Sequence, residues 1–462
     1  MTPFFNVSPV IHIHRVRADD IVCIAMPRAH ARKRKRIDAV EPRSERARFP
    51  NRYRGYAPAR GERLPRLPYG SLAPNDFHAR FVSTRMPVVF TDVVKRGSDF
   101  AAASTWTDEF LRARCGGSRV RVETRVGGRF GRGVYRDETF ASFMDKFAKR
   151  DCAVYLSAGG KREAFDGPAR ALTYAGAGDA SERGLFPLRP RAMPESLVPA
   201  DVNLWMGRAE RGKTTSSGLH HDFHDNLYVL LRGEKRFKLY APSEAEKMYT
   251  HGDIRCVHEN GLINYEKFPG TLQDGDVALE SGETALERRV RLARQSVIDG
   301  DEDKDGEDGE DGEEDDGEPS FGDDEFDGVD DFDELEESIS ADSSIEDARG
   351  DEMEAKALSA ACDPASFSRV DYDTLDRFPL FKDAACIEVT VRAGEALYLP
   401  AGWFHDVSSG ELDDDCGHCA FNFWFHPPLL GEQWSARRAL WEEDFKRSVV
   451  DKLYSDGEAN VT

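Results

Sequence analysis

Apolar and polar residues alternate with a period of two in part of the chain, a spacing that predicts β-strands. Strands are expected where β-prone apolar residues run or alternate and a glycine or proline follows. The segments that meet this criterion are the apolar, β-prone run 226–231 and the alternating segment 237–241, which ends at Pro242. Two other segments, 140–147 and 431–454, repeat apolar residues at helical spacing. The pattern therefore predicts a strand–turn–strand unit at 226–241, a helix near 140–147 and a C-terminal helix.

The charge of the chain is divided very unevenly. The whole chain of 462 residues carries a formal net charge of −22, but residues 299–354 alone hold 30 acidic and 2 basic side chains. Like charges repel, and this segment has few aromatic residues with which to form a core, so we expect it to be disordered. Its most direct interpretation is a solvated linker. A binding site for basic proteins and a phosphorylation tract, with Ser343 and Ser344 as acceptors, are the alternatives.

The first 66 residues are basic, with 16 basic and 6 acidic side chains and a compact basic run at 32–36. Such a run is typical of nuclear import signals and of nucleic-acid contacts. Because the segment is rich in arginine, an organelle targeting peptide is an alternative. A nuclear or cytoplasmic protein is expected, with the basic run favouring the nucleus. No run of eighteen or more apolar residues occurs, so no membrane-spanning helix is expected.

These boundaries divide the chain into five parts. We expect a basic and disordered extension (1–66), two parts of one β domain (67–298 and 355–430), an acidic insert between them (299–354) and a C-terminal helix (431–462). A long surface loop is tolerated between two halves of a β domain, because the entropy of closing a loop grows only slowly with its length.

Three residues offer the chemistry of a metal site. His220 and Asp222 form a His-x-Asp pair, and His405 follows 185 residues after His220. Two imidazoles and one carboxylate on one face of an octahedral iron leave the other face open for a co-substrate and O₂. On a strand, alternate side chains share a face, so His220 and Asp222 can reach one metal while His221 points away. Since a His-x-Asp pair alone is common, its meaning depends on the flanking sequence.

The flanking sequence resembles the JmjC branch of the cupin superfamily, and most closely its small protein hydroxylases. Segment 217–242 matches the strand–turn–strand unit around the first histidine, and segment 389–405 matches the hairpin before the distal histidine. Segment 420–425 matches the strand that closes the barrel, segment 85–90 resembles the opening strand of the family, and segment 202–207 resembles the strand that leads into the first histidine. The resemblance therefore implies a mainly β domain with flanking helices. The resemblance covers most of residues 67–270 and 363–445. It implies a double-stranded β-helix, the jelly-roll barrel of the cupins.

The resemblance also implies a set of ligands. His220, Asp222 and His405 match the Fe(II) ligands of the family, whose co-substrates are 2-oxoglutarate and O₂. Lys235 lies 15 residues after His220 and matches a lysine that pairs with the distal carboxylate of 2-oxoglutarate. A dicarboxylate that enters a barrel needs a buried cation, and lysine supplies a compact one.

Four further residues match positions near the co-substrate. Ser217 stands where many relatives have a threonine that bonds the distal carboxylate, and Tyr155 matches a tyrosine that reaches the same group. Asn226 and Asn422 match positions that form hydrogen bonds near the iron and the co-substrate. His224 shares strand parity with His220, and we expect it to lie outside the metal's ligand shell.

The expected activity is hydroxylation of a side chain of a partner protein. Demethylation of methylated lysine is a second hypothesis, in which the basic extension and the acidic insert would suit histone partners. A third is a non-catalytic module of cupin fold that binds histones or other basic proteins through the insert. The apolar stripe of the C-terminal helix packs either on its own domain or, as in several small relatives, in a homodimer.

Overall fold

The computed structural model describes residues 49–126, 129–158, 167–174, 184–209, 214–279, 281–302, 364–409, 417–429 and 433–447. The basic run at 32–36 and residues 303–354 of the predicted acidic insert lie outside these ranges, as do Ser343 and Ser344.

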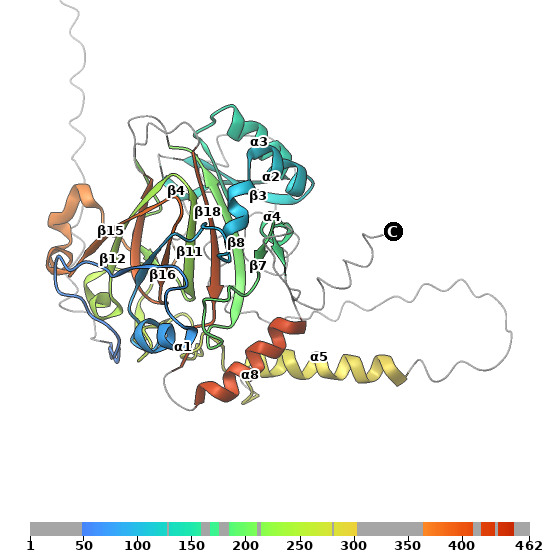
Figure 1. The fold of residues 1–462 in the computed structure, drawn as a ribbon. Coiled ribbons are helices and arrows are strands. Elements are labelled where there is room, and N and C mark those ends of the chain that lie inside the picture. The colour runs from blue at the N-terminus through green and yellow to red at the C-terminus, as the bar shows by residue number, and fades with distance from the viewer. Residues whose placement is uncertain are drawn as a thin grey trace, which may run out of the picture. The chain divides into compact units, whose positions relative to one another are not determined.

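A nine-stranded sheet forms the larger layer of the domain (Figure 1). Its order is β1-β2-β16-β11-β18-β8-β5-β3-β4, and neighbours are antiparallel except for the parallel pair β1 and β2. The strands are β1 (Arg66–Pro68), β2 (Val88–Thr91), β3 (Arg119–Val126), β4 (Arg129–Thr139), β5 (Val154–Ala158), β8 (Pro199–Gly207), β11 (Asp225–Arg232), β16 (Glu395–Leu399) and β18 (His418–Phe425).

The second layer is a five-stranded sheet of order β10-β17-β12-β15, with β9 paired to β17. Its strands are β9 (Thr215–Ser216), β10 (His220–His221), β12 (Glu234–Tyr240), β15 (Ile387–Arg392) and β17 (Phe404–Ser409). One apolar cluster joins the layers, with Leu230 and Leu397 from the large sheet and Phe237 and Ile387 from the small one. The two sheets therefore face each other across a shared core, as expected for a cupin jelly roll.

Helices cover the outer face of the nine-stranded sheet. Helix α3 (Phe140–Ala148) buries Phe140, Phe143 and Phe147 in the same cluster as Phe421 of β18, as its helical spacing predicts. Thr139 caps this helix, because its hydroxyl accepts a hydrogen bond from the Ser142 N–H. Helix α2 (Asp108–Cys115) packs beside it.

Shorter elements complete the domain. They are α1 (Pro74–Phe77), α4 (Pro168–Ala171), β6 (Thr173–Tyr174), β7 (Phe186–Pro187), β13 (Ile254–Val257) and β14 (Ile263–Tyr265), one π-turn (His78–Val82), and 3₁₀ turns at Ala101–Thr105, Pro242–Lys247, Tyr372–Arg377 and Pro379–Asp383.

The N-terminal boundary differs from the prediction. Residues 49–66 were expected to belong to a disordered extension, yet they pack on the domain. The Arg52 N–H donates to the Val257 carbonyl (2.9 Å), the Tyr56 N–H donates to the Thr84 carbonyl (2.8 Å), and Leu64 is buried in the core between the sheets. The sequence did not indicate this packing, because residues 49–66 are rich in arginine and contain few apolar residues.

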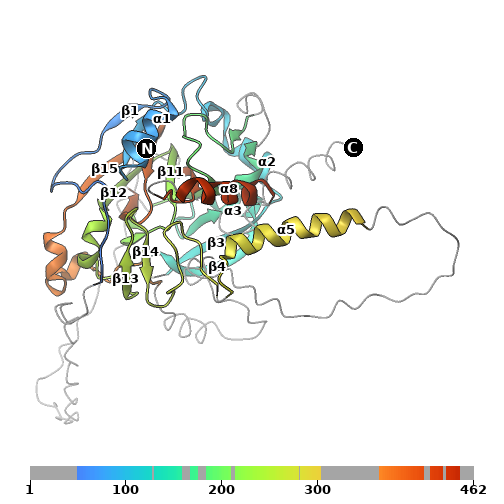
Figure 2. The same ribbon diagram turned by 90° about the horizontal axis from the view of Figure 1, so that it is seen from below.

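Two helices lie side by side at one end of the domain (Figure 2). Helix α5 (Ala285–Glu302) runs four residues past the start predicted for the acidic insert, and α8 (Gln433–Phe445) forms part of the predicted C-terminal helix. Arg289 pairs with Asp444, and Arg294 pairs with Glu443. Residues 448–462 lie outside the described ranges.

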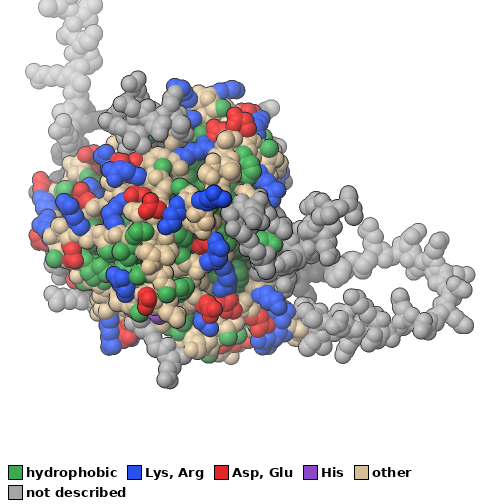
Figure 3. Space-filling view, viewed as in Figure 1, with side chains coloured by type: hydrophobic (Ala, Val, Ile, Leu, Met, Phe, Trp, Pro, Cys, Tyr) green, Lys and Arg blue, Asp and Glu red, His purple; other side chains and the backbone are tan. Residues whose placement is uncertain are grey.

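On the face seen in Figure 3, basic and acidic side chains are interspersed over the described surface. This mixture agrees with a nearly neutral folded domain, once the acidic insert and the basic extension are set aside. None of the described helices is both long and apolar enough to cross a membrane.

Candidate metal centre and co-substrate site

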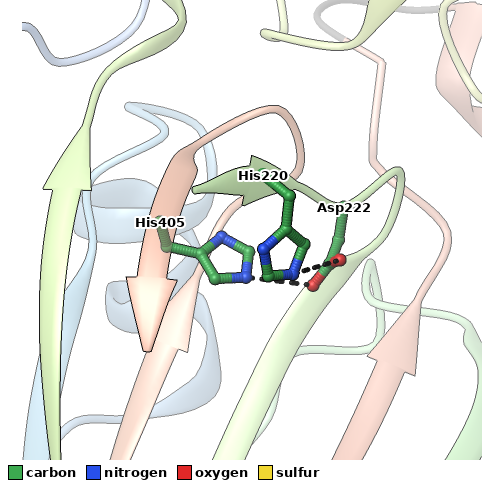
Figure 4. A group of neighbouring side chains, drawn as sticks. All are labelled: His220, Asp222 and His405. Atoms are coloured by element: carbon green, nitrogen blue, oxygen red, sulfur yellow. Dashed lines mark ion pairs between the residues drawn. The ribbon is translucent and has the colours of Figure 1, made fainter. Parts of the chain in front are cut away.

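The three residues predicted as metal ligands converge at one point (Figure 4). His220 of β10 and His405 of β17 are paired residues of neighbouring strands, and Asp222 follows directly after β10. The Asp222 carboxylate lies 3.8 Å from Nε2 of His220 and 3.6 Å from Nε2 of His405. All three ligand atoms lie within 4.8 Å of one another, which suits a single ion.

Backbone carbonyls orient both imidazoles. Nδ1 of His220 lies 2.9 Å from the Gly218 carbonyl, and Nδ1 of His405 lies 2.9 Å from the Trp403 carbonyl. Because a carbonyl only accepts, each Nδ1 carries the proton, and each Nε2 lone pair points to the metal position. Burial lowers the pKa of His220 to about 4, so its imidazole is neutral and able to bind a metal.

A tight turn just before His405 forms a backbone hydrogen bond with the segment that carries Asp222. The Gly402 N–H donates to the Asp222 carbonyl (2.9 Å), and Gly402 has a φ of +78°. A Cβ at this position would collide with the Gly261 carbonyl, so the turn requires glycine for both conformation and space.

The neighbouring histidines lie outside the ligand group, as expected. His221 is buried and its Nε2 lies 2.6 Å from the Tyr265 hydroxyl. The ring of His224 stacks on Trp424, with centroids 5.5 Å apart.

Lys235 brings a buried positive charge into the interior. Its side chain lies on β12, and its ammonium donates to Oγ of Ser409 (2.7 Å) and lies 5.9 Å from the centroid of the Tyr155 ring. Burial lowers the pKa of Lys235 to about 7. No described carboxylate forms an ion pair with Lys235, so this buried position suits an anionic ligand.

The hydroxyl beside Lys235 belongs to Ser409, a residue that the sequence did not indicate, and not to Ser217. Ser217 follows β9, and its Oγ accepts a hydrogen bond from the Val407 N–H (3.2 Å). Ser409 is instead the strand partner of both Lys235 and Thr215. The signal was present in strand parity, since Ser409 lies four positions after His405 and so shares its face.

Asn226 and Asn422 form part of a polar cluster in the interior. Nδ2 of Asn422 donates to Oδ1 of Asn226 (3.2 Å), and Nε1 of Trp205 donates to Oδ1 of Asn422 (2.8 Å). On β8 the strand partner of Asn422 is Asn203, whose Nδ2 is buried without a hydrogen-bond partner in the described structure. The cluster therefore has donor capacity to spare for a ligand. Asn203 and Trp205 were not identified from the sequence.

The donor set fits the cofactors of the resemblance. Two imidazoles and a carboxylate suit Fe(II), and the buried ammonium of Lys235 suits the distal carboxylate of 2-oxoglutarate. The side chains of His220 and Asp222 keep 16% and 24% of their surface exposed, so solutes can reach the metal position.

Comparison with known proteins agrees with this geometry. The profile described as "Cupin-like domain" matches residues 74–430, more than three quarters of the chain. A "JmjC domain-containing protein 4" of Schizosaccharomyces pombe is 30% identical over 461 aligned positions, covering 88% of this chain and 95% of the relative. The chain belongs to the JmjC branch of the cupin-like family.

Other relatives of this JmjC protein match smaller parts. A "Lysine-specific demethylase JMJ32" of Arabidopsis thaliana is 23% identical over 49% of the chain and 42% of its own length. The human "Bifunctional peptidase and (3S)-lysyl hydroxylase JMJD7" is 47% identical over 51 residues, 11% of the chain and 15% of its own length. JmjC proteins generally use Fe(II) and 2-oxoglutarate, and their substrates differ.

Proposed function

We propose that this JmjC protein is an Fe(II)- and 2-oxoglutarate-dependent dioxygenase that hydroxylates a side chain of a partner protein. The observation that carries the proposal is the convergence of His220, Asp222 and His405, with the buried ammonium of Lys235 in the same interior. The bound iron and 2-oxoglutarate supply the oxidation: O₂ and 2-oxoglutarate yield succinate and CO₂, and one oxygen atom enters a substrate C–H bond.

The protein's residues hold and shield these groups. His220 and His405 would present Nε2 to the iron, and Asp222 would balance part of its charge while one face stays open. Lys235 neutralises the distal carboxylate, with Tyr155 beside it. Phe367 covers one face of His220, with ring centroids 4.7 Å apart and planes 12° from parallel, and so keeps water from that side of the ligand.

The experiment is an anaerobic titration of Fe(II) and 2-oxoglutarate, followed by O₂ and mass spectrometry of proteins from a cell extract. We expect succinate and a product heavier by one oxygen atom with the native protein. Asp222→Ala removes the carboxylate ligand, so iron and turnover should be lost together, beyond the roughly 10–100-fold that loss of an outer-shell partner costs. Full consumption of 2-oxoglutarate by this variant would refute the assignment.

Demethylation of methylated lysine is a second candidate, supported by the similarity to the Arabidopsis relative described as a lysine-specific demethylase. Hydroxylation of an N-methyl group forms an unstable product that releases formaldehyde. Incubation with methylated histone peptides therefore separates the two activities, because formaldehyde indicates demethylation and a stable gain of one oxygen indicates hydroxylation. Tight histone binding without succinate formation would instead favour the non-catalytic module.

A further inference from the structure

A second buried nitrogen lies near Lys235 and has no role in the site described so far. His418 begins β18, and its side chain is 4% exposed. Its Nε2 is fully buried and has no hydrogen-bond partner in the described structure. A buried polar atom of this kind is normally satisfied in native proteins, so a ligand is its natural partner.

Strand register places His418 across Gly207 from Tyr155, the tyrosine whose ring Lys235 approaches. Gly207 of β8 pairs with Tyr155 of β5 on one side and with His418 of β18 on the other. The rings of Tyr155 and His418 close over this glycine, with centroids 5.5 Å apart. Lys235 of the facing sheet reaches the same tyrosine ring, 5.9 Å from its centroid.

Gly207 is what allows the two rings to meet. A Cβ at this position would lie 2.7 Å from Cδ2 of Tyr155 and 3.1 Å from Cε1 of His418. Both distances are shorter than ordinary carbon contacts, so any larger residue would push the rings apart.

The electrostatic environment keeps the imidazole of His418 neutral. Burial, the Lys235 ammonium and the Arg208 guanidinium all lower its pKa well below the usual value. A neutral imidazole carries one N–H, which donates to a carboxylate without placing a second positive charge beside the lysine.

We infer that His418 donates a hydrogen bond from Nε2 to the distal carboxylate of the 2-oxoglutarate that Lys235 neutralises, an inference that rests on the proposed function. The 2-oxo acid end of the co-substrate would bind the metal. His418, Lys235 and Tyr155 then surround the other end, with contributions from two strands of the large sheet and one of the small sheet.

Two amide substitutions at position 418 test this contact. In His418→Gln the amide nitrogen comes near the position of Nε2, whereas in His418→Asn it comes near Nδ1. The protein is loaded with Mn(II) without O₂, and binding of 2-oxoglutarate is measured by calorimetry. We expect His418→Asn to bind roughly tenfold or more weakly, since a hydrogen bond to a charged group is lost. His418→Gln should stay within about threefold of the native protein.

Electron paramagnetic resonance of bound Mn(II) and the melting temperature serve as controls, and both should match those of the native protein in the two variants. Native affinity for 2-oxoglutarate in His418→Asn would overturn the inference. Equal weakening in the two variants would also overturn it, because a general loss of packing does not distinguish Gln from Asn.

The same experiment also tests the proposed function separately from the role of His418. If the native protein binds Mn(II) but not 2-oxoglutarate, the co-substrate assignment fails, and the role of His418 fails with it. If the variants at position 418 do not fold, Gly207→Ala tests the same contact, because the new methyl group separates the rings. Weaker binding of 2-oxoglutarate is then expected, and unchanged binding would count against the inference.

Discussion

Among single residues, Lys235 shows how burial prepares a side chain for its ligand. Its ordinary pKa of 10.5 falls to about 7 because the ammonium is removed from water without a carboxylate partner in the described structure. A carboxylate placed beside it favours the charged form and raises the pKa again. Binding of 2-oxoglutarate and protonation of Lys235 are therefore coupled.

This coupling predicts the pH dependence of binding. Above pH 7 the free protein holds Lys235 largely neutral, so binding should take up about one proton and weaken about tenfold from pH 8 to pH 9. Calorimetry in buffers of different ionisation enthalpy measures the uptake. Lys235→Met should abolish it, whereas Lys238→Met on the same strand should not. Persistent proton uptake in Lys235→Met would assign the coupling to another group.

At the scale of elements, two anchors hold the strands that carry the ligands. The first is a buried ion pair in which Arg85 binds the Asp225 carboxylate, and both side chains are fully buried. The Tyr398 hydroxyl (2.6 Å) and the Ala401 N–H (2.9 Å) donate to the same carboxylate. Ala401 belongs to the turn before His405, so this pair connects the start of β11 to the segment that leads to the distal ligand.

Asp225→Asn should therefore destabilise the fold by about 3–5 kcal/mol, because it leaves the Arg85 charge buried without its counter-ion. Asp145→Asn is the matched control. Asp145 pairs with Arg112, and both side chains are about half exposed, so the cost should be below about 1 kcal/mol. Urea unfolding measures both. Similar losses in the two variants would mean that the buried pair has no special role.

The second anchor is Phe367, which follows the acidic insert in the chain. Its ring stacks on His220, and the neighbouring Ser368 N–H donates to the Leu219 carbonyl (2.8 Å). The segment that follows the insert in the chain therefore packs against His220, the first ligand.

Phe367→Ala should weaken metal binding by roughly 10–100-fold, as expected when the support of a ligand is removed. Phe378→Ala is the control, since Phe378 is also buried but packs on Tyr249, with centroids 5.2 Å apart. It should lower stability without changing metal affinity. Titration with Mn(II) measures the difference, and equal affinities in the two variants would exclude a specific role for Phe367.

At the scale of the whole molecule, α8 packs on its own domain. Trp434, Trp441 and Phe445, which form part of the predicted apolar stripe, are buried in the main core cluster. Trp441 stacks on His426, with centroids 3.4 Å apart. The face that suggested a homodimer is thus covered within the chain, and the dimer stays a prediction.

Trp441→Ala should destabilise the domain by about 3–5 kcal/mol, the usual cost of removing a large buried aromatic ring. Lys446→Ala, at an exposed residue just after α8, should change stability by less than about 0.5 kcal/mol. Chemical denaturation gives both values, and sedimentation shows whether the assembly changes. If Trp441→Ala changed the assembly without a loss of monomer stability, the result would support a dimer interface formed by α8.

The sequence alone determined the features that depend on local pattern. Period-two alternation predicted β12, an apolar β-prone run predicted β11, helical spacing predicted α3, and the residue types of His220, Asp222 and His405 indicated a metal site. These features follow from side chains that repeat on one face, and a repeat is visible without coordinates.

Only the tertiary structure decided which distant residues meet. Lys235 lies beside Ser409, and Tyr155 meets His418 across Gly207, because hydrogen-bonded register aligns strands far apart in the chain. The packing of residues 49–66 and the covering of α8 also depend on partners distant in sequence. Register and packing arise from these long-range contacts, which no single segment encodes.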